Sequence, residues 1–311
     1  MKTLVIDGKE VRVDDVTALR MKNLSVKEKL KEILDKFWTD KKLGKHKTLK
    51  NDHGEILLKT LLVDPETFSS DLMENKLKVG DMSSSIKSLI SGTKLDGDLR
   101  EEYLRLCLNV TTERPAIGKG EFLFAATFAN LGFSSESGDL VDLESGSKIE
   151  VKGISAQLGN GQNGRFRQLT ESIVYTLLKK LEIVDVAKSD MYLSEEVAKK
   201  IKTAIGLDRN KAAFAFSCFQ NIRNENESIS RSAANLYFET KQFIRTVAAM
   251  HLFTYMKLEK SDYLLILNDA KFTIFRAPED LLDAYRIVEK LSIKPWRVGE
   301  YGIKVTLRND V

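Results

Sequence analysis

Residues 118–153 constrain the possible fold more than any other stretch, because they place Glu121, Asp139, Glu150 and Lys152 in consecutive secondary-structure elements. The pattern predicts a helix with Glu121 near its first turn, a strand that opens with Asp139, and a second strand that ends at Lys152. Apolar residues alternate with Glu150 and Lys152, so the two-residue period of a strand puts these two side chains on one face. Three carboxylates and one ammonium are therefore expected to converge.

Carboxylates beside an ammonium can hold a hard divalent cation through oxygen ligands and keep a positive charge near an attacking water or a scissile phosphate. This arrangement resembles the PD-(D/E)XK nuclease superfamily, in which an Asp on one strand and an E-x-K on the next strand bind Mg²⁺. Gly138 and Asp139 correspond to the "PD" element, with glycine in place of proline. Glu150, Val151 and Lys152 correspond to the E-x-K element.

The resemblance implies an α/β protein with a mixed sheet of the restriction-endonuclease-like type, an N-terminal helical arm and a large helical insertion. Asp139, Glu150 and the main-chain carbonyl of Val151 would hold Mg²⁺, for which Mn²⁺ could substitute, and Glu121 would be a further or second-metal ligand. Lys152 would orient the attacking water or help to deprotonate it, and would offset charge on the phosphate. The cluster is expected at a solvent-reached edge of the sheet.

The predicted function is that of a Mg²⁺-dependent nuclease, an endonuclease that hydrolyses phosphodiester bonds of DNA, with RNA as an alternative substrate. Two other classes stay open. The chain could be a catalytically inactive nuclease-fold protein that binds DNA or serves a structural role, for example in a phage assembly. It could also be a helical interaction protein with a coincidental Glu-Val-Lys pattern, and a large separation of Asp139 from Glu150 would favour that alternative.

Composition limits the classes of protein to consider. The chain has 311 residues, enough for one elaborated domain or two ordinary ones. Its net charge is only +4, so any basic surface for nucleic acid must come from local segregation of charge. Cys107 and Cys218 do not suggest a disulfide framework, which favours the cytoplasm of a bacterium or a phage-infected host. Neither a signal-peptide core nor a membrane-spanning apolar run is visible, so no membrane association is expected.

The predicted organisation is a mainly helical arm over residues 1–112 and a nuclease-like core over residues 113–311. In the arm, a hairpin around Asp7-Gly8 is expected over residues 4–13. The lysine-rich residues 41–50 are interpreted as a solvated linker, with phosphate contacts as the alternative. Helices are expected at residues 25–37, 55–62, 65–77 and 98–108, and a turn followed by a short helix at residues 80–91.

Residues 154–168 contain three glycines and two asparagines, which predict a mobile loop next to the metal. Arg165 and Arg167 in this loop, with Gln157 before them, are candidate contacts to a nucleic-acid backbone. A flexible connector with incidental arginines is an equally weighted alternative.

A helical insertion is predicted over residues 169–257, with breaks at 206–208 and 221–228. Its aromatic residues are interpreted as core and not as a base-stacking platform. The insertion is expected to pack on the core and to make self-association contacts, so the partners are DNA and a second copy of the chain or an assembly component. Strands at residues 263–267, 271–276 and 301–307 and a helix at 279–291 complete the prediction.

Overall fold

The computed structural model divides the chain into two compact units, each described by itself below. The first unit comprises residues 1–152 and 261–274, and the second comprises residues 153–260 and 275–311. Within the described residues, no helix combines the length and apolar character needed to cross a membrane. The described residues are 2–6, 9–13, 84–90, 97–109, 120–128, 130–134, 138–153, 156–158, 173–183, 192–220, 227–268, 271–294, 296–297 and 303–308.

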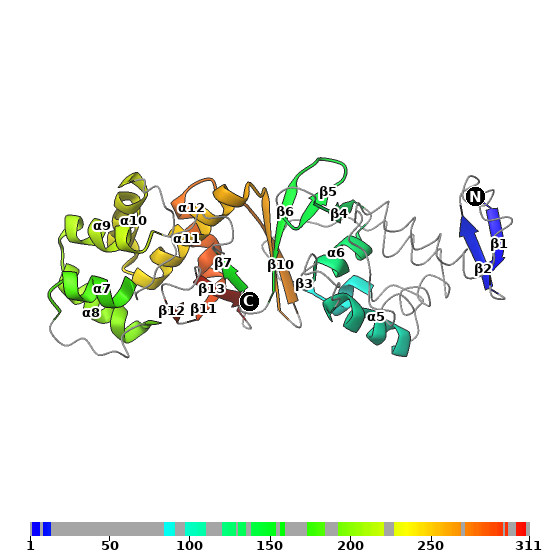
Figure 1. Ribbon diagram of the computed structural model, residues 1–311, viewed down its shortest axis with the longest axis horizontal. Coiled ribbons are helices and arrows are strands. Elements are labelled where there is room, and N and C mark those ends of the chain that lie inside the picture. Colours follow the sequence, from blue (N-terminus) through cyan, green and yellow to red (C-terminus); the bar gives the residue numbers. More distant parts are fainter. Residues whose placement is uncertain are drawn as a thin grey trace. The chain divides into compact units, whose positions relative to one another are not determined.

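The first unit is built on a six-stranded sheet with the order β3-β10-β9-β6-β5-β4. The strands β4, β5 and β6 form an antiparallel meander, whereas β6 and β9 are parallel. The expectation of an α/β protein with a mixed sheet is therefore confirmed at that level (Figure 1). The strand bounds are β3 Ser84–Ser85, β4 Leu131–Phe133, β5 Leu140–Asp142, β6 Lys148–Lys152, β9 Tyr263–Leu267 and β10 Lys271–Arg276.

Strand β9 lies inside the sheet, between β10 and β6. The middle residues of β9, Leu264 to Ile266, are fully buried, as expected for a strand covered on both faces. The connection from β9 to β10 is only three residues long and closes with the N–H of Asn268 donating to the Lys271 carbonyl at 2.9 Å, which makes these strands an antiparallel hairpin. The parallel pairing of β6 with β9 instead requires a long crossover, and α7–α11 lie in that connection.

Helix α6 (Glu121–Thr127) is apolar after its first residue, and Phe122, Leu123 and Phe124 are fully buried. The helix begins at Gly120, whose φ of +91° lies in the left-handed region. A Cβ at this position would lie 2.8 Å from Cδ1 of Leu267 on β9, so only glycine allows the start of α6 to come this close to the sheet. The start of α6 is thus fixed against the end of β9.

The described elements of residues 1–112 can be compared with the predicted N-terminal arm. The hairpin is confirmed as β1 (Lys2–Ile6) and β2 (Lys9–Val13), which form a two-stranded sheet of their own. The helix expected at residues 98–108 is confirmed as α5 (Gly97–Asn109). In the region 80–91, a 3-10 helix (Lys87–Ile90) follows β3, whose two serines pair with β10 where a turn was predicted. The predictions for residues 14–77 lie outside the described residues.

The second unit contains helices and two small sheets. Its strands pair in the order β11-β13-β7 and as β12-β8. The helix bounds are α7 Ile173–Lys180, α8 Glu195–Ile205, α9 Arg209–Cys218, α10 Glu227–Thr240, α11 Phe243–Glu259 and α12 Leu281–Glu289. The strand bounds are β7 Ala156–Leu158, β8 Tyr192–Leu193, β11 Leu291–Lys294, β12 Trp296–Arg297 and β13 Ile303–Leu307.

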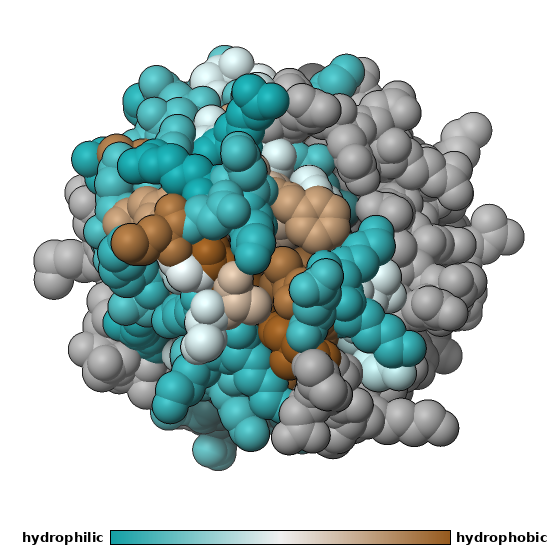
Figure 2. Space-filling model, turned by 90° about the vertical axis from the view of Figure 1, so that its left-hand side faces the viewer, coloured by the Kyte–Doolittle hydropathy of each residue, from teal (hydrophilic) through white to brown (hydrophobic). Residues whose placement is uncertain are grey.

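The aromatic residues of the insertion form a core. Phe216, Phe219 and Phe243 are fully buried, and the ring centroids of Phe216 and Phe243 lie 4.9 Å apart. The core interpretation is therefore confirmed for Phe216 and Phe219, whereas Phe214 is partly exposed. Figure 2 views the unit from the side of α7–α10 and shows a band of apolar side chains among hydrophilic ones. Leu207, in the turn between α8 and α9, is the most exposed large apolar side chain among the described residues.

Several element boundaries in the second unit differ from the prediction. Residues 156–158 were assigned to a loop but form β7, and β8 lies inside the predicted helical insertion. Both strands pair with residues far along the chain, β7 with β13 and β8 with β12, and no local pattern reveals such pairing. Helix α12 begins after Asp280, whose carboxylate caps the N–H of Asp283, and not at residue 279.

His251 on α11 is a buried titratable group of the second unit. Its Nε2 lies 2.6 Å from the carbonyl oxygen of Phe219. Burial lowers the pKa of His251 from 6.5 to about 4, although the Phe219 carbonyl acts in the opposite direction. Since the unfolded chain binds this proton more readily, the stability that neutral His251 contributes is complete above about pH 6.5 and is lost as the pH falls through 4.

We expect the free energy of unfolding to fall by about 3 kcal/mol between pH 7 and pH 4 because of His251, since one pKa unit corresponds to about 1.4 kcal/mol. His251→Gln retains a side-chain N–H for the Phe219 carbonyl but does not titrate. Urea unfolding followed by circular dichroism at several pH values should therefore give a shallower acid dependence for the variant. Identical pH dependence of the two proteins would contradict the assignment.

Candidate active site

Asp139 occupies the position immediately before β5, and two hydrogen bonds tie it to β6. Its N–H donates to the carbonyl of Ile149 at 2.9 Å, and its Oδ2 accepts the N–H of Val151 at 2.8 Å. The registered pairing of β5 with β6 begins one residue later, at Leu140. The Asp139 carboxylate thus takes the place of a main-chain acceptor just beyond the paired residues of β5 and β6. It therefore lies next to the E-x-K segment.

The backbone conformation of residue 138 excludes the proline that the resembled motif has at this position. The φ of Gly138 is +73°, a left-handed conformation that proline cannot adopt. A Cβ at Gly138 would also lie 3.3 Å from the carbonyl oxygen of Ile149 and 3.4 Å from Oγ of Ser261. The glycine therefore provides both the turn into β5 and the close approach to β6.

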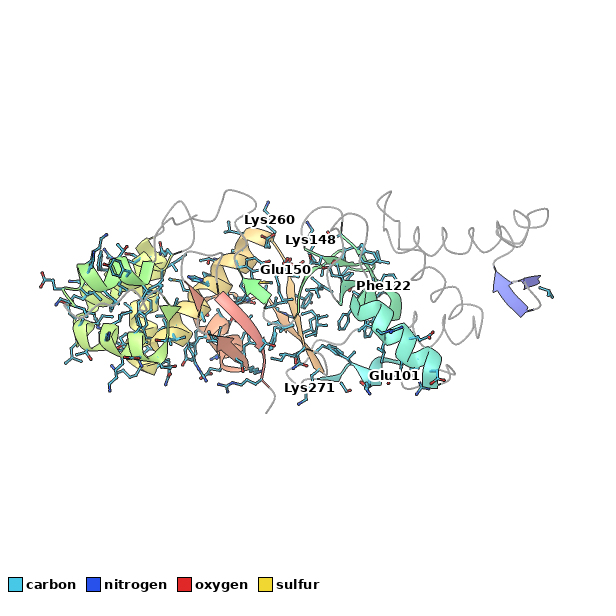
Figure 3. The ribbon with its side chains drawn as sticks, turned by 60° about the horizontal axis from the view of Figure 1, so that its bottom comes forward. Glu101, Phe122, Lys148, Glu150, Lys260 and Lys271 are labelled. Carbon is cyan, nitrogen blue, oxygen red and sulfur yellow. The ribbon has the colours of Figure 1, made fainter. Side chains whose placement is uncertain are left out.

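Glu150 and Lys152 lie on one face of β6, as their spacing predicts, and form an ion pair in which Nζ of Lys152 donates to Oε1 of Glu150. Glu150 is 5% exposed, and the Lys152 side chain is 18% exposed. Figure 3 shows Glu150 in the middle of β6, with Lys148 at the beginning of the same strand. Two opposite charges are thus held together where water has little access.

The expectation of a solvent-reached sheet edge is wrong. Strand β6 lies between β5 and β9, in the interior of the sheet. Strand β5 pairs with one side of β6, and β9 pairs with the other side in parallel. The residues of β9 are distant in sequence, so the sequence pattern around β6 gave no sign of this second neighbour. The carboxylate of Glu150 consequently depends on Lys152 for charge compensation.

The neighbouring carboxylates keep Lys152 in its charged form. Burial alone would lower the pKa of Lys152, but the charges of Glu150 and Asp139, the hydrogen bond that Lys152 donates to Glu150 and the charge of Glu121 together raise it above its usual 10.5. The ion pair therefore stabilises the fold below about pH 10.5 and loses its effect as the pH rises through the raised pKa. At neutral pH the side chain is an ammonium, which suits charge stabilisation and orientation of a water better than proton abstraction.

Glu121 completes the cluster from α6. It is the first residue of the helix and is 7% exposed. A carboxylate in the first turn interacts favourably with the partial positive charge of the helix N-terminus, which offsets part of the cost of burial. The charges of Glu150, Asp139 and Glu121 all act on the Lys152 ammonium, so the four predicted catalytic residues lie in one region of the first unit. The hydrogen bond from the Val151 N–H places the Asp139 carboxylate beside the residue that follows Glu150.

The donor types suit a hard cation, because Asp139, Glu150 and the carbonyl of Val151 are all oxygen ligands on adjoining strands. In the arrangement described above, Asp139 accepts a main-chain N–H and Glu150 accepts an ammonium proton. Among the described residues, no group of three His, Cys, Asp or Glu side chains is arranged to hold a metal ion. A Mg²⁺ ion at this place would share the Glu150 carboxylate, whose Oε1 accepts a hydrogen bond from Nζ of Lys152.

Comparisons of this chain with protein-family models, with curated proteins and with solved structures found no match.

Asp262 is a positioning residue that sequence reasoning missed. Its Oδ2 accepts the N–H of Lys148 at 2.8 Å, and its own N–H donates to the Lys148 carbonyl at 2.8 Å. These bonds fix the register of β6 against β9 just before the Glu150 position. The only local signal is an aspartate immediately before an apolar strand, and nothing in the sequence connects it to a residue so far away.

The proposed nucleic-acid contacts are less completely described. Gln157 lies on β7 in the second unit, opposite Lys304 of β13. Its place on a strand corrects the expectation that it belongs to a glycine-rich loop. Arg165 and Arg167 lie outside the described residues, so their role in binding stays a prediction.

Proposed function

We propose that this protein is a metal-dependent nuclease that hydrolyses phosphodiester bonds of DNA, built on a restriction-endonuclease-like core. The observation that carries the proposal is the meeting of Glu121, Asp139 and Glu150 around the buried ammonium of Lys152. A buried cation among several carboxylates is costly for a fold that needs only stability. Clusters of this kind are found mainly at functional sites.

The order of elements agrees with this proposal. Helix α6, the meander β4-β5-β6, a helical crossover and the parallel strand β9 follow one another along the chain. The resembled superfamily likewise places a helix and another strand after its E-x-K strand. The present crossover is much longer, because it contains most of the second unit.

In the proposed mechanism, Asp139, Glu150 and the Val151 carbonyl would hold Mg²⁺, with Glu121 as a further ligand. A cation held there would polarise a phosphoryl oxygen and lower the pKa of a bound water. Lys152 donates a hydrogen bond to the attacking water or to a phosphoryl oxygen and stabilises the negative charge that develops. A new P–O bond forms to the water oxygen, the bond to the ester oxygen breaks, and the leaving oxygen takes up a proton.

Incubation of the protein with supercoiled plasmid, single-stranded DNA and RNA, each in Mg²⁺, Mn²⁺ or EDTA, tests the proposal directly. We expect cleavage of DNA with either metal ion, no cleavage in EDTA, and recovery when Mg²⁺ is added in excess of the chelator. The Glu150→Gln protein, purified in the same way, controls for a contaminating nuclease. Failure to cut any substrate with either ion would reject the proposal.

A catalytically inactive nuclease-fold protein that binds DNA, for instance in a phage assembly, is the second candidate. The observation that favours it is the closed set of contacts in the cluster, in which Glu150 pairs with Lys152 and Asp139 with the Val151 N–H. This candidate predicts DNA binding that is the same in Mg²⁺ and in EDTA, with no cleavage in either. An electrophoretic mobility assay beside the plasmid assay separates the two candidates.

If Arg165 and Arg167 hold the nucleic-acid backbone, replacing both with Ala should weaken binding equally for all sequences. The slope of log affinity against log salt concentration should fall by about one to two, because each lost phosphate contact removes about one released counterion. Fluorescence anisotropy at several salt concentrations measures both quantities. Unchanged affinity and slope would assign these residues to a connector.

A further inference from the structure

An open cavity of about 350 Å³ lies within the second unit, and no residue of the candidate active site lines it. Its volume falls in the range of pockets that hold small ligands. Its walls come from the beginnings of α8 and α11, from β8 and β11, and from the residue after β13. Leu193, Phe243 and Leu291 are buried and form apolar parts of the wall.

The charged side chains that line the cavity are mostly cations. Among the lining residues that the structure describes, Lys202, Arg245 and Arg308 are cations and Glu195 is the single carboxylate, which gives a net charge of +2. The three cations are partly buried and come from three separate parts of the chain. In the described part of the protein, none of the three makes an ion pair or a side-chain hydrogen bond. Their charges therefore remain available to a ligand.

The N-termini of α8 and α11 both lie in the wall, but only that of α8 has a side-chain cap and acidic residues to balance its partial positive charge. At α8, Oγ of Ser194 accepts the N–H of Val197 at 3.2 Å, and the first turn carries Glu195. At α11, Gln242 makes no side-chain cap and the first turn has no acidic residue. The first turn of α11 instead carries Arg245, a cation where the helix dipole disfavours one.

We propose that this cavity binds a phosphate monoester. A monoester carries a charge close to −2 at neutral pH, which balances the net +2 of the lining, whereas a phosphodiester carries only one negative charge. The guanidinium groups of Arg245 and Arg308 can each donate two hydrogen bonds to phosphate oxygens, and the uncapped N–H groups of α11 point to the same kind of ligand. Binding also relieves the conflict between Arg245 and the helix dipole.

Three ligands carry a phosphate group of this charge: inorganic phosphate, a nucleoside monophosphate and a 5′-phosphorylated nucleic-acid end. Experiment can distinguish which of them the cavity binds. The proposal does not depend on nuclease activity, since every lining residue lies in the second unit and the catalytic cluster lies in the first. Loss of cleavage in Glu150→Gln and loss of phosphate binding in a cavity variant would thus be separate results.

Isothermal titration of the whole protein in EDTA tests the proposal with four probes: inorganic phosphate, AMP, a 5′-phosphorylated oligonucleotide and the same oligonucleotide with a 5′-hydroxyl. We expect at least one of the three phosphate-bearing probes, which are inorganic phosphate and the two monoesters, to bind and to raise the melting temperature. The tightest of the three identifies the source. If none binds at millimolar concentration, or if the 5′-hydroxyl oligonucleotide binds as tightly as its phosphorylated form and with the same sensitivity to Arg245→Gln, the proposal is overturned.

Arg245→Gln and Arg308→Gln should each weaken monoester binding by at least about tenfold, since a hydrogen bond between charged groups contributes about 1.5 to 3 kcal/mol. Lys199→Gln is the matched control, because Lys199 lies exposed on α8 outside the cavity. Without ligand, Arg245→Gln should leave the melting temperature unchanged or raise it, because it removes a cation from the α11 N-terminus. Equal affinities of the cavity variants and the Lys199→Gln protein would overturn the proposal.

Discussion

Asp139→Asn and Glu150→Gln are each expected to lower Mg²⁺-dependent DNA cleavage by roughly a thousandfold or more. Both substitutions keep the shape of the side chain and remove the negative charge that a hard cation requires. A metal ion provides several kcal/mol of transition-state stabilisation, and about 4 kcal/mol corresponds to a thousandfold in rate. Initial rates on plasmid over a range of Mg²⁺ concentrations, with calorimetric titration of Mg²⁺, measure both effects.

Glu144→Gln is the matched control for the carboxylate variants, because Glu144 is exposed in the turn between β5 and β6. It should cleave at the rate of the original protein. The structure adds an expectation for stability, since Glu150→Gln removes the partner of a mostly buried ammonium and should cost about 2 kcal/mol. Circular dichroism must therefore show folded protein at the assay temperature. Variants that cut as fast as the original protein would refute the metal site.

Lys152→Met should suppress cleavage about a hundredfold or more while Mg²⁺ binding is retained or strengthened. The lysine acts on the water and on transition-state charge, for which the loss of one donor typically costs two to three orders of magnitude. It also pairs with Glu150, so its removal frees that carboxylate for the ion. The informative result is a loss of cleavage without a loss of Mg²⁺ binding. If Lys152 only formed a structural ion pair, its replacement would alter stability and leave cleavage unchanged.

Lys148→Met is the control for this experiment, since Lys148 lies on the same strand at the opposite end from Lys152. Its cleavage rate and Mg²⁺ affinity should stay close to those of the original protein. Lys152→Arg keeps the positive charge in a larger group and should recover only part of the activity. Equal loss of Mg²⁺ binding and cleavage in Lys152→Met would contradict the role proposed for the lysine.

The local parts of the candidate site were predictable because each depends on short-range physics. The apolar alternation in β6 places Glu150 and Lys152 on one face, and that prediction is confirmed by their ion pair. The glycine before Asp139 marks a turn into a strand, and Gly138 has the positive φ that such a turn uses. The helix with Glu121 in its first turn is likewise confirmed.

Burial of the site could not be predicted, because it depends on which strand lies beside β6. The parallel partner β9 comes from beyond the whole helical insertion, and its register is held by Asp262 and not by any local pattern. For the same reason β7 and β8 were missed, since their partners β13 and β12 lie far along the chain.

The sequence by itself determined the elements around the cluster, their order and the chemical character of their side chains, since periodicity and turn residues act over a few positions. Only the tertiary structure decided that Glu150 is buried, that Lys152 stays an ammonium among three carboxylates, and that three cations meet the uncapped end of α11. These properties depend on distances between residues remote in sequence. Such distances set desolvation and Coulomb energies, and no local pattern of residues encodes them.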